Sequence, residues 1–401
     1  MAEPFDPSTF NPHDPAFLAD PYRTYTAFRD LAPIYPVALY GSDWMFRYAD
    51  CVQVLTDEKV WIKNRPDGTP PPLGPYGTMT SNFPLSLFAS DPELHTQLRS
   101  ILEPLFKDAI QDAQQLARKV GEPLLAAAQQ HGRIELISDY GLPLPSSVLF
   151  TLLGIPDDPV IRGTLMMWAQ AIAAAHDITQ SVTVRATGAT VSMAANTYFE
   201  ALLVANRTTP AQGFFADICN AFASAGLSPQ EVQVCAIDFL VAGYLSTTFI
   251  IGTGVRNLLL NPGQLQDLRD DPSLIDGAVE EMLRFDGPVQ VIDRYAACDT
   301  SVGERVYKRN DKVTAVVGSA GHDAEMFENP ESFLITRANA SEHIAFGDGI
   351  HYCIGAPLAR LVAPVAIQML IEAFPNLALD GIPQWQTDPY LRAVTNLPLR
   401  F

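Results

Sequence analysis

A single cysteine, Cys353, lies in the stretch AFGDGIHYCIGAPLAR, just before a run of residues that is typical of a helix. A thiolate is a strong, electron-rich ligand for haem iron, and backbone N–H groups that donate to the sulfur hold it in place. Glycines let a backbone turn sharply enough to bring such groups close, and this stretch contains Gly347, Gly349 and Gly355. The helix expected from about Ala356 would also direct the positive end of its dipole towards the sulfur. The arrangement favours a ligand cysteine over a buried structural one.

The same residues resemble the cysteine-ligand signature of the cytochrome P450 haem-thiolate monooxygenases. The matching positions are Phe346, Gly347, Gly349, His351, Cys353, Gly355 and the helix start at Leu358, Ala359 and Arg360. The resemblance implies haem b as the cofactor and Cys353 as the axial ligand of its iron. It also implies cofactor-binding roles for Phe346, Gly347, His351 and Gly355. It extends from about Pro15 to the C-terminus, which implies one haem-thiolate domain over residues 1–401 with a short N-terminal extension of about residues 1–14.

Further cationic residues match family positions that hold the haem propionates. His95 and Arg99 lie four residues apart in DPELHTQLRS, on one face of an expected helix. Arg294, in VIDRYA, matches a family arginine that contacts a propionate. Buried carboxylates require cationic or hydrogen-bonding partners, so we expect these residues and His351 to surround the propionates.

Glu281 and Arg284 lie three residues apart in EEMLR, on one face of another expected helix. In isolation this is a routine helical ion pair. The resemblance implies that the pair locks the core on the cysteine side of the haem, which is a structural role and not a catalytic one.

The expected central helix carries AGYLSTT, where the family has Ala-Gly-x-Asp/Glu-Thr. Ala242 and Gly243 match, and the resemblance implies that they let the helix distort above the haem and leave room for oxygen. Leu245 stands at the acid position, and Ser246, followed by Thr247, stands at the alcohol position. Cleaving the O–O bond consumes two protons, which the family's acid and alcohol relay. Leu245 cannot relay a proton, so Ser246 and Thr247 are the candidate catalytic residues.

The altered relay leaves several reactions open. The first is monooxygenation of a hydrophobic substrate, as hydroxylation or oxidative dealkylation, with protons arriving through the hydroxyls, water or the substrate. The second is direct use of peroxide, although the Arg-Pro pair of the peroxygenase branch is absent from AGYLSTT. The third is other haem-thiolate chemistry, such as nitric oxide reduction or coupling of aromatic rings. A haem-binding protein without turnover is a further alternative.

Most of the segments that must position these residues have helical patterns, which predicts a mainly α fold with a smaller β portion. The resemblance implies a cytochrome P450 fold, with the haem between a long central helix and the cysteine-ligand loop. The segment from Ser228, a predicted N-cap before Pro229, to the NPG at 261–263 is apolar on nearly every face and should be the buried central helix. Further helices are expected within 108–132, 164–177, 188–207 and 272–285. Extended segments are expected at 33–39, 43–48, 312–319 and 391–401, and a long irregular loop at 61–88.

The charge balance constrains the partners. A net charge of −19 disfavours nucleic acid and anionic membrane surfaces, and the N-terminus shows no signal-peptide pattern. No apolar run reaches about twenty residues without polar interruption, so we expect no membrane span and a cytoplasmic monomer.

The resemblance implies that electrons come from a ferredoxin, which an NAD(P)H-dependent reductase reduces. Such a donor is acidic, so docking requires a local basic patch, for which the candidates are Arg99, Lys107, Arg337 and Arg360.

The resemblance also places the walls of the substrate pocket. They are expected at Phe83–Phe88, Met166–Ala174, Leu240–Thr247, Pro288–Ile292 and Val394–Thr395. Their composition is mainly apolar, which favours a hydrophobic substrate. Tyr244 is expected either to contact the substrate or to pack on the back of the helix.

Overall fold

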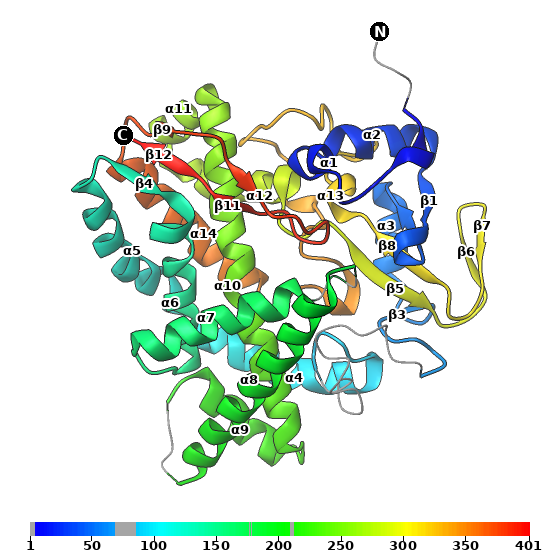
Figure 1. Ribbon diagram of the computed structural model, residues 1–401, viewed down its shortest axis with the longest axis horizontal. Helices are drawn as coiled ribbons and strands as arrows, with labels where there is room; N and C mark the ends of the chain where they lie inside the picture. Colours follow the sequence, from blue (N-terminus) through cyan, green and yellow to red (C-terminus); the bar gives the residue numbers. More distant parts are fainter. Residues whose placement is uncertain (1–4, 69–85, 176, 178, 209–211) are drawn as a thin grey trace.

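The long apolar helix expected at the centre is present as α10, from Pro229 to Leu260 (Figure 1). The computed structural model describes residues 5–68, 86–175, 177, 179–208 and 212–401. Ser228 begins α10 with a capping box, in which its hydroxyl accepts from the Glu231 N–H and the Glu231 carboxylate accepts from the Ser228 N–H. α10 and α14 (Ala356–Ala373) are long and apolar enough to cross a membrane, but most of each is buried inside the fold. Their apolar character is therefore explained by burial in the core.

α10 is apolar on most sides because other helices surround it. It contacts α14 and α6 (Pro143–Leu153), α7 (Pro159–Ala174), α8 (Val182–Thr208), α9 (Phe214–Ser224) and α12 (Ile275–Asp286). Further helices are α1 (Pro15–Ala19), α2 (Tyr22–Leu31), α3 (Tyr48–Thr56), α4 (Pro92–Ala109), α5 (Ala113–Gln129), α11 (Pro262–Asp270) and α13 (Val317–Ala320). α5 packs against α14, and α4 against α9. The helical character expected from the sequence is confirmed.

The β portion is divided: its largest sheet lies on one side of the helices, and a smaller sheet beside the C-terminus lies on the opposite side (Figure 1). Its largest sheet has the order β1-β2-β8-β5-β3, in which β2 and β8 are parallel and the other pairs antiparallel. These strands are β1 (Ile34–Val37), β2 (Ser42–Met45), β3 (Trp61–Ile62), β5 (Ile292–Ala296) and β8 (Lys312–Ala315). Smaller sheets pair β10 (Gln384–Trp385) with β11 (Val394–Asn396), join β4 (Arg133–Glu135), β12 (Pro398–Arg400) and β9 (Ala378–Leu379), and pair β6 (Thr300–Val302) with β7 (Arg305–Tyr307).

Two predicted elements differ from the structure. The helix expected within 108–132 is the end of α4 and all of α5, separated by a turn in which the Gln111 side chain donates to the Asp108 carboxylate at 3.4 Å. The turn keeps apolar residues at helical spacing, so the pattern continues through it. The segment 312–319, expected to be extended, is strand β8 followed by the short α13. A tertiary contact lies at the change: the Gly318 N–H donates to the Gln290 carbonyl at 3.1 Å, and a Cβ on Gly318 would overlap the Gln290 side chain.

The described part of the N-terminal segment packs onto the domain. The Phe5 and Phe10 rings lie edge-on to Phe28, with centroids 4.9 and 5.0 Å away. Phe10 also lies edge-on to Trp44 of β2 at 5.8 Å. Residues 5–14, expected as an extension, therefore share an aromatic cluster with α2 and the large sheet.

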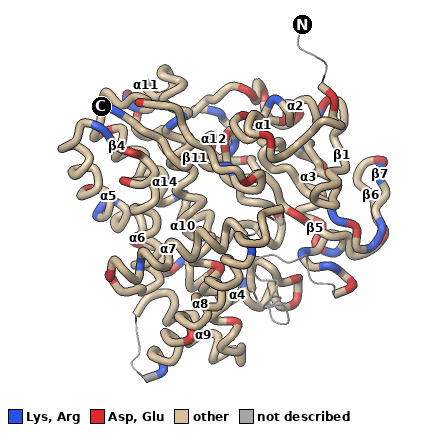
Figure 2. The backbone as a smooth tube through the Cα atoms, viewed as in Figure 1, with Lys and Arg blue, Asp and Glu red and all other residues tan. Residues whose placement is uncertain are grey.

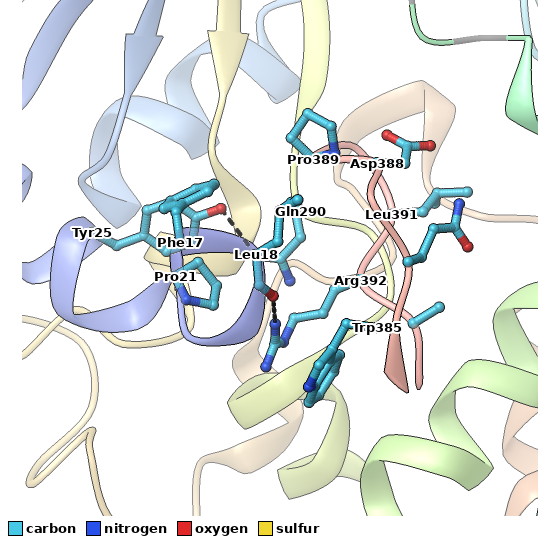
Figure 3. A pocket seen from close by; sticks show the side chains of 12 residues that line it. Phe17, Leu18, Pro21, Tyr25, Gln290, Trp385, Asp388, Pro389, Leu391 and Arg392 are labelled. Carbon is cyan, nitrogen blue, oxygen red and sulfur yellow. Dashed lines mark hydrogen bonds between the residues drawn. The ribbon is translucent and has the colours of Figure 1, made fainter. Parts of the chain in front are cut away.

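The C-terminal part of the chain is tied to the same region. Figure 3 shows the Arg392 side chain donating to the Leu18 carbonyl of α1, at 2.7 Å, beside a small cavity. The Tyr25 hydroxyl of α2 donates to the Gln290 side chain at 3.1 Å. These contacts hold segments from opposite ends of the chain together.

The predicted pair of Glu281 and Arg284 is fully buried. The Arg284 guanidinium donates to the Glu281 carboxylate at 2.7 and 2.8 Å, and both side chains are 0% exposed. Arg337 donates to the same carboxylate at 3.0 Å. Arg284 also donates to backbone carbonyls within 321–332, so the group joins α12 to the segment that leads towards Cys353.

Candidate cofactor site

The loop around Cys353 is folded back on itself by a backbone hydrogen bond. The Cys353 N–H donates to the Phe346 carbonyl at 3.0 Å. Gly347 and Gly349 have φ angles of 72° and 67°, in the left-handed region that favours glycine. A Cβ on Gly349 would lie 2.4 Å from the carbonyl oxygen of Leu55. These two glycines are therefore required by the turn, as the sequence indicated.

The sulfur of Cys353 lies at the start of α14, where backbone N–H groups point towards it. Burial raises the pKa of the thiol, whereas hydrogen bonds from the N–H groups of Gly355 and Ala356, and the charges of Arg99 and Arg360, lower it. Gly355 differs from the expectation of a sharp turn, because its φ of −81° is open to any residue. A Cβ on Gly355 would lie 3.6 Å from the sulfur. This is an ordinary van der Waals distance, so the geometry does not require a glycine at position 355.

Four of the expected cofactor residues form a cationic cluster beside this loop. His95 of α4 is 2% exposed, and its ring centroid lies 4.3 Å from that of His351. Arg294 of β5 is 3% exposed and donates to the preceding carbonyl at 2.9 Å. Arg99, one helical turn after His95, donates to a carbonyl of the cysteine loop. The structure thus brings together residues from α4, β5 and the loop.

Burial lowers the pKa of Arg294, and burial together with neighbouring charges lowers the pKa of both histidines. Burial is the largest cause, and the pKa values are about 4 for His95, about 2 for His351 and about 10 for Arg294. The charges of Arg294 and Arg99 lower the pKa of both histidines further. The Nδ1 atom of His95 is buried without a hydrogen-bond partner among the described residues. Two carboxylates would satisfy such a set of donors, so the residues present fit the propionates of a haem.

Lys63 belongs to the same cluster and was not predicted from the sequence. It directly follows β3, whose antiparallel pairing sets Ile62 opposite Tyr295 and therefore brings Lys63 beside Arg294. Burial and then the charge of Arg294 lower the pKa of the Lys63 ammonium to about 7. Lys63 in turn lowers the pKa of His351. No local pattern could have indicated this, because the strand pairing joins distant parts of the chain.

The face of α10 that carries AGYLSTT is accessible at Ala242 and Ser246. Ala242 is exposed in the middle of a buried helix, and Ser246 is half-buried with its hydroxyl donating to the Ala242 carbonyl at 3.3 Å. Leu245 is 7% exposed and packs in the core, and Thr247 is 4% exposed. The structure thus separates the two candidate catalytic residues, because only Ser246 has an accessible hydroxyl.

Gly243 and Tyr244 have packing roles. A Cβ on Gly243 would lie 2.9 Å from Leu149 of α6, so the glycine lets α6 and α10 approach. The buried Tyr244 donates its hydroxyl hydrogen to the Met166 carbonyl of α7 at 3.1 Å, which is the packing alternative of the two expected. α10 is one continuous α-helix through this stretch, without the distortion that the resemblance implied.

The structure describes most of the residues that were expected to line the substrate pocket. Residues 83–85 lie outside the described residues, and Phe88 is 54% exposed with the Lys63 ammonium 4.0 Å from its ring centroid. Val394 of β11 is fully buried and faces Gly252 of α10. Val394 is therefore a core residue.

The expected docking cations differ in availability. Lys107, at the end of α4, is exposed. Arg337 is not available, because its side chain is 5% exposed and is paired with Glu281. Arg360 is one-third exposed and pairs with a carboxylate of α12 at 2.6 Å, and Arg99 is 19% exposed. Of the four, Lys107 is the exposed one and has no ion pair within the described part of the chain.

Comparison with known proteins agrees with this geometry. The family model for cytochrome P450 matches residues 214–388. The cytochrome P450 monooxygenase PikC of Streptomyces venezuelae is 32% identical, covering 96% of this chain and 92% of that protein. The 6-deoxyerythronolide B hydroxylase of Saccharopolyspora erythraea is 30% identical, with coverage of 96% and 97%. The crystal structure of P450BioI bound to an acyl carrier protein superposes with a TM-score of 0.89, at 28% identity over 96% of this chain and 100% of that one.

The chain belongs to the cytochrome P450 family and is a P450 monooxygenase of the bacterial type. Members of this family bind haem b through a cysteine thiolate, so haem b is its cofactor. The predicted fold class is confirmed by the same structural similarity.

Proposed function

We propose that Cys353 provides the thiolate ligand of the haem iron and that the enzyme inserts one oxygen atom from O2 into a small hydrophobic molecule. The observation that carries this proposal is that two backbone N–H groups at the start of α14, those of Gly355 and Ala356, donate hydrogen bonds to the sulfur of Cys353. The bound haem supplies the iron that activates O2. Phe346 supports the ligand loop from one side, since its ring lies 4.8 Å from the Arg360 guanidinium.

The cationic cluster holds the haem carboxylates in this proposal. Arg294 and His95 are buried, His351 is half-buried, and Arg99 links α4 to the loop. A positive charge on these groups is costly until an anion is bound. Lys63 adds a further ammonium beside Arg294. Binding of the propionates would offset the cost of charge in this cluster and raise the pKa of His95, His351 and Arg294.

Protons reach the oxygen site through Ser246 in this proposal. Its hydroxyl is on the accessible face of α10, beside Ala242, where a proton can be passed from water. Leu245 packs in the core and supplies none. Thr247 is buried, which favours Ser246 as the hydroxyl that acts.

The partners follow from the class of enzyme and from charge. Electrons would come from a ferredoxin and its NAD(P)H-dependent reductase, with Lys107 as part of the docking surface. A cytoplasmic monomer, without nucleic-acid or membrane partners, is consistent with the net charge of −19. Mainly apolar side chains around α10 support a hydrophobic substrate.

The test is turnover with labelled oxygen. The haem-loaded protein, a surrogate ferredoxin, its reductase and NADPH are supplied with 18O2 and a library of apolar compounds. We expect one labelled atom in the product, and a larger share of released peroxide in Ser246→Ala than in Thr247→Ala. Products without label would instead support other haem-thiolate chemistry, and binding without any product would support a haem-binding protein.

A further inference from the structure

α10 carries three charged residues among thirty-two: Glu231, Asp238 and Arg256 (Figure 2). Glu231 forms the capping box at the start of the helix. Arg256 donates to Asn257 at 3.0 Å and stacks over the ring of Trp385. Asp238 lies between these two, and among the described residues neither capping nor an ion pair accounts for it.

Asp238 lies on the accessible stripe of α10. It precedes Ala242 by four residues and Ser246 by eight, and residues four apart are neighbours on a helix surface. Asp238 and Ser246 are half-buried and Ala242 is exposed, whereas Leu240 and Leu245 are buried in the core. With a rise of about 1.5 Å per residue, Asp238 lies about 6 Å along the axis from Ala242. The carboxylate is therefore next to the part of α10 that faces the reaction site in the proposed function.

Two groups of the described residues donate hydrogen bonds to the Asp238 carboxylate. The Ser86 hydroxyl donates to it, and the Phe88 N–H lies 3.5 Å from its Oδ2. No cation of the described residues lies within ion-pair distance of it. The ammonium of Lys63 influences it electrostatically but is directed onto the Phe88 ring. A carboxylate offers about four acceptor positions, which is more than the donors of the described residues fill.

The surroundings of Asp238 are apolar. Leu87 and Cys235 are buried close to it, and burial raises the pKa of the Asp238 carboxyl to about 7. A desolvated carboxylate is costly unless a cation pairs with it, and such a group in an apolar site is typical of ligand recognition. A positively charged nitrogen, whether protonated or quaternary, supplies the opposite charge.

We propose that Asp238 anchors the substrate, and that this substrate is an apolar molecule carrying one positively charged nitrogen. This inference rests on the proposed function, because it names the substrate class of that same site. The apolar body lies along α10 towards Ala242 and Ser246, and the cationic nitrogen pairs with the carboxylate. Lys63 is the charged group that faces Asp238 from another element, and in the proposed haem complex its charge is balanced by the propionates.

Binding of matched ligands to the haem-loaded protein tests the proposal. The probes are decyltrimethylammonium, decanol and decanoate, which share one chain and differ in charge, and a quaternary ammonium cannot ligate the iron. Affinity is measured by calorimetry and by the spin-state change of the haem. Asp217→Asn is the matched control, because it removes the same charge from the exposed face of α9 and so reports non-specific attraction of cations to an acidic protein.

We expect the ammonium to bind at least tenfold more tightly than decanoate. Asp238→Asn should weaken ammonium binding by tenfold or more and leave decanol unchanged, whereas Asp238→Glu and Asp217→Asn should keep the preference. In the unaltered protein the affinity for the ammonium should rise between pH 6 and pH 8, because ionisation of Asp238 creates the charge.

The proposal is overturned if Asp238→Asn and Asp217→Asn bind the ammonium equally. If Asp238→Asn does not fold, the pH series and Asp238→Glu decide, and equal affinity for all three probes overturns it. Tight binding of the ammonium without oxidation of any compound would leave the anchor standing and contradict the proposed reaction. Oxidation of neutral compounds without any preference for the ammonium would do the reverse.

Discussion

The buried carboxylate of Glu281 is the residue on which the packing around the cysteine loop depends. It accepts two hydrogen bonds from Arg284, at 2.7 and 2.8 Å, and two from Arg337, at 3.0 and 3.2 Å. The Leu334 N–H donates to it at 2.9 Å. Replacing it by glutamine keeps the shape and removes the charge, so two guanidinium groups would remain buried against a neutral amide.

The expected cost of Glu281→Gln follows from this burial. Glu281 and Arg284 are 0% exposed and Arg337 is 5% exposed. Removing one partner of such a buried group costs about 3–5 kcal/mol in the free energy of unfolding. A loss of this size is a large fraction of the total stability of an ordinary domain, about 5–15 kcal/mol.

The neighbouring residue offers a matched control. Glu280 pairs with Arg360 at 2.6 Å and His343 at 3.2 Å, but its side chain is 15% exposed and that of Arg360 33%. Glu280→Gln should therefore cost less, about 1–2 kcal/mol. Urea unfolding of the haem-loaded proteins, followed by fluorescence, measures both. Equal losses in the two variants would refute the reasoning that complete burial sets the cost.

Three further predictions concern packing, charge and docking. Gly243→Ala should destabilise the protein by about 1–3 kcal/mol through a clash with α6, whereas Gly163→Ala, in open space, should be neutral or stabilising in thermal unfolding. The pKa of Lys63 in the folded, haem-free protein is about 7, below its usual value, so between about pH 7 and 10 the folded protein binds fewer protons than the unfolded protein. The free energy of unfolding should therefore rise with pH over this range, and Lys63→Met should flatten the rise. Lys107→Glu should slow reduction by ferredoxin at low ionic strength, whereas Arg207→Glu, on α8, should not; equal rates would contradict the docking site.

The features that could be predicted from the sequence are local ones. The turn glycines before Cys353, the N-cap Ser228 of α10 and the pair of Glu281 and Arg284 each depend on residues within a few positions, so local sequence indicates them. The break between α4 and α5 was missed because the turn preserves helical spacing.

The features that could not be predicted depend on distant contacts. Lys63 joins the cationic cluster only because β3 pairs with β5. Arg337 was expected on the surface, but it turns inward to a carboxylate of α12. The role of Gly243 depends on the approach of α6, and that of Asp238 on the loop at Ser86 and Phe88. In each case the partner is far away in the chain, and no periodic pattern records it.

The central claim, that the Cys353 thiolate ligates the haem iron, is tested most directly by the optical spectrum of the reduced carbon monoxide complex. We expect the red-shifted Soret band of a thiolate-ligated haem in the unaltered protein. The control variant Cys298→Ala should keep this band, because Cys298 is exposed and lies outside the cysteine loop. Cys353→Ala should lose this band, whether or not haem is retained. Persistence of the band in Cys353→Ala would contradict the account.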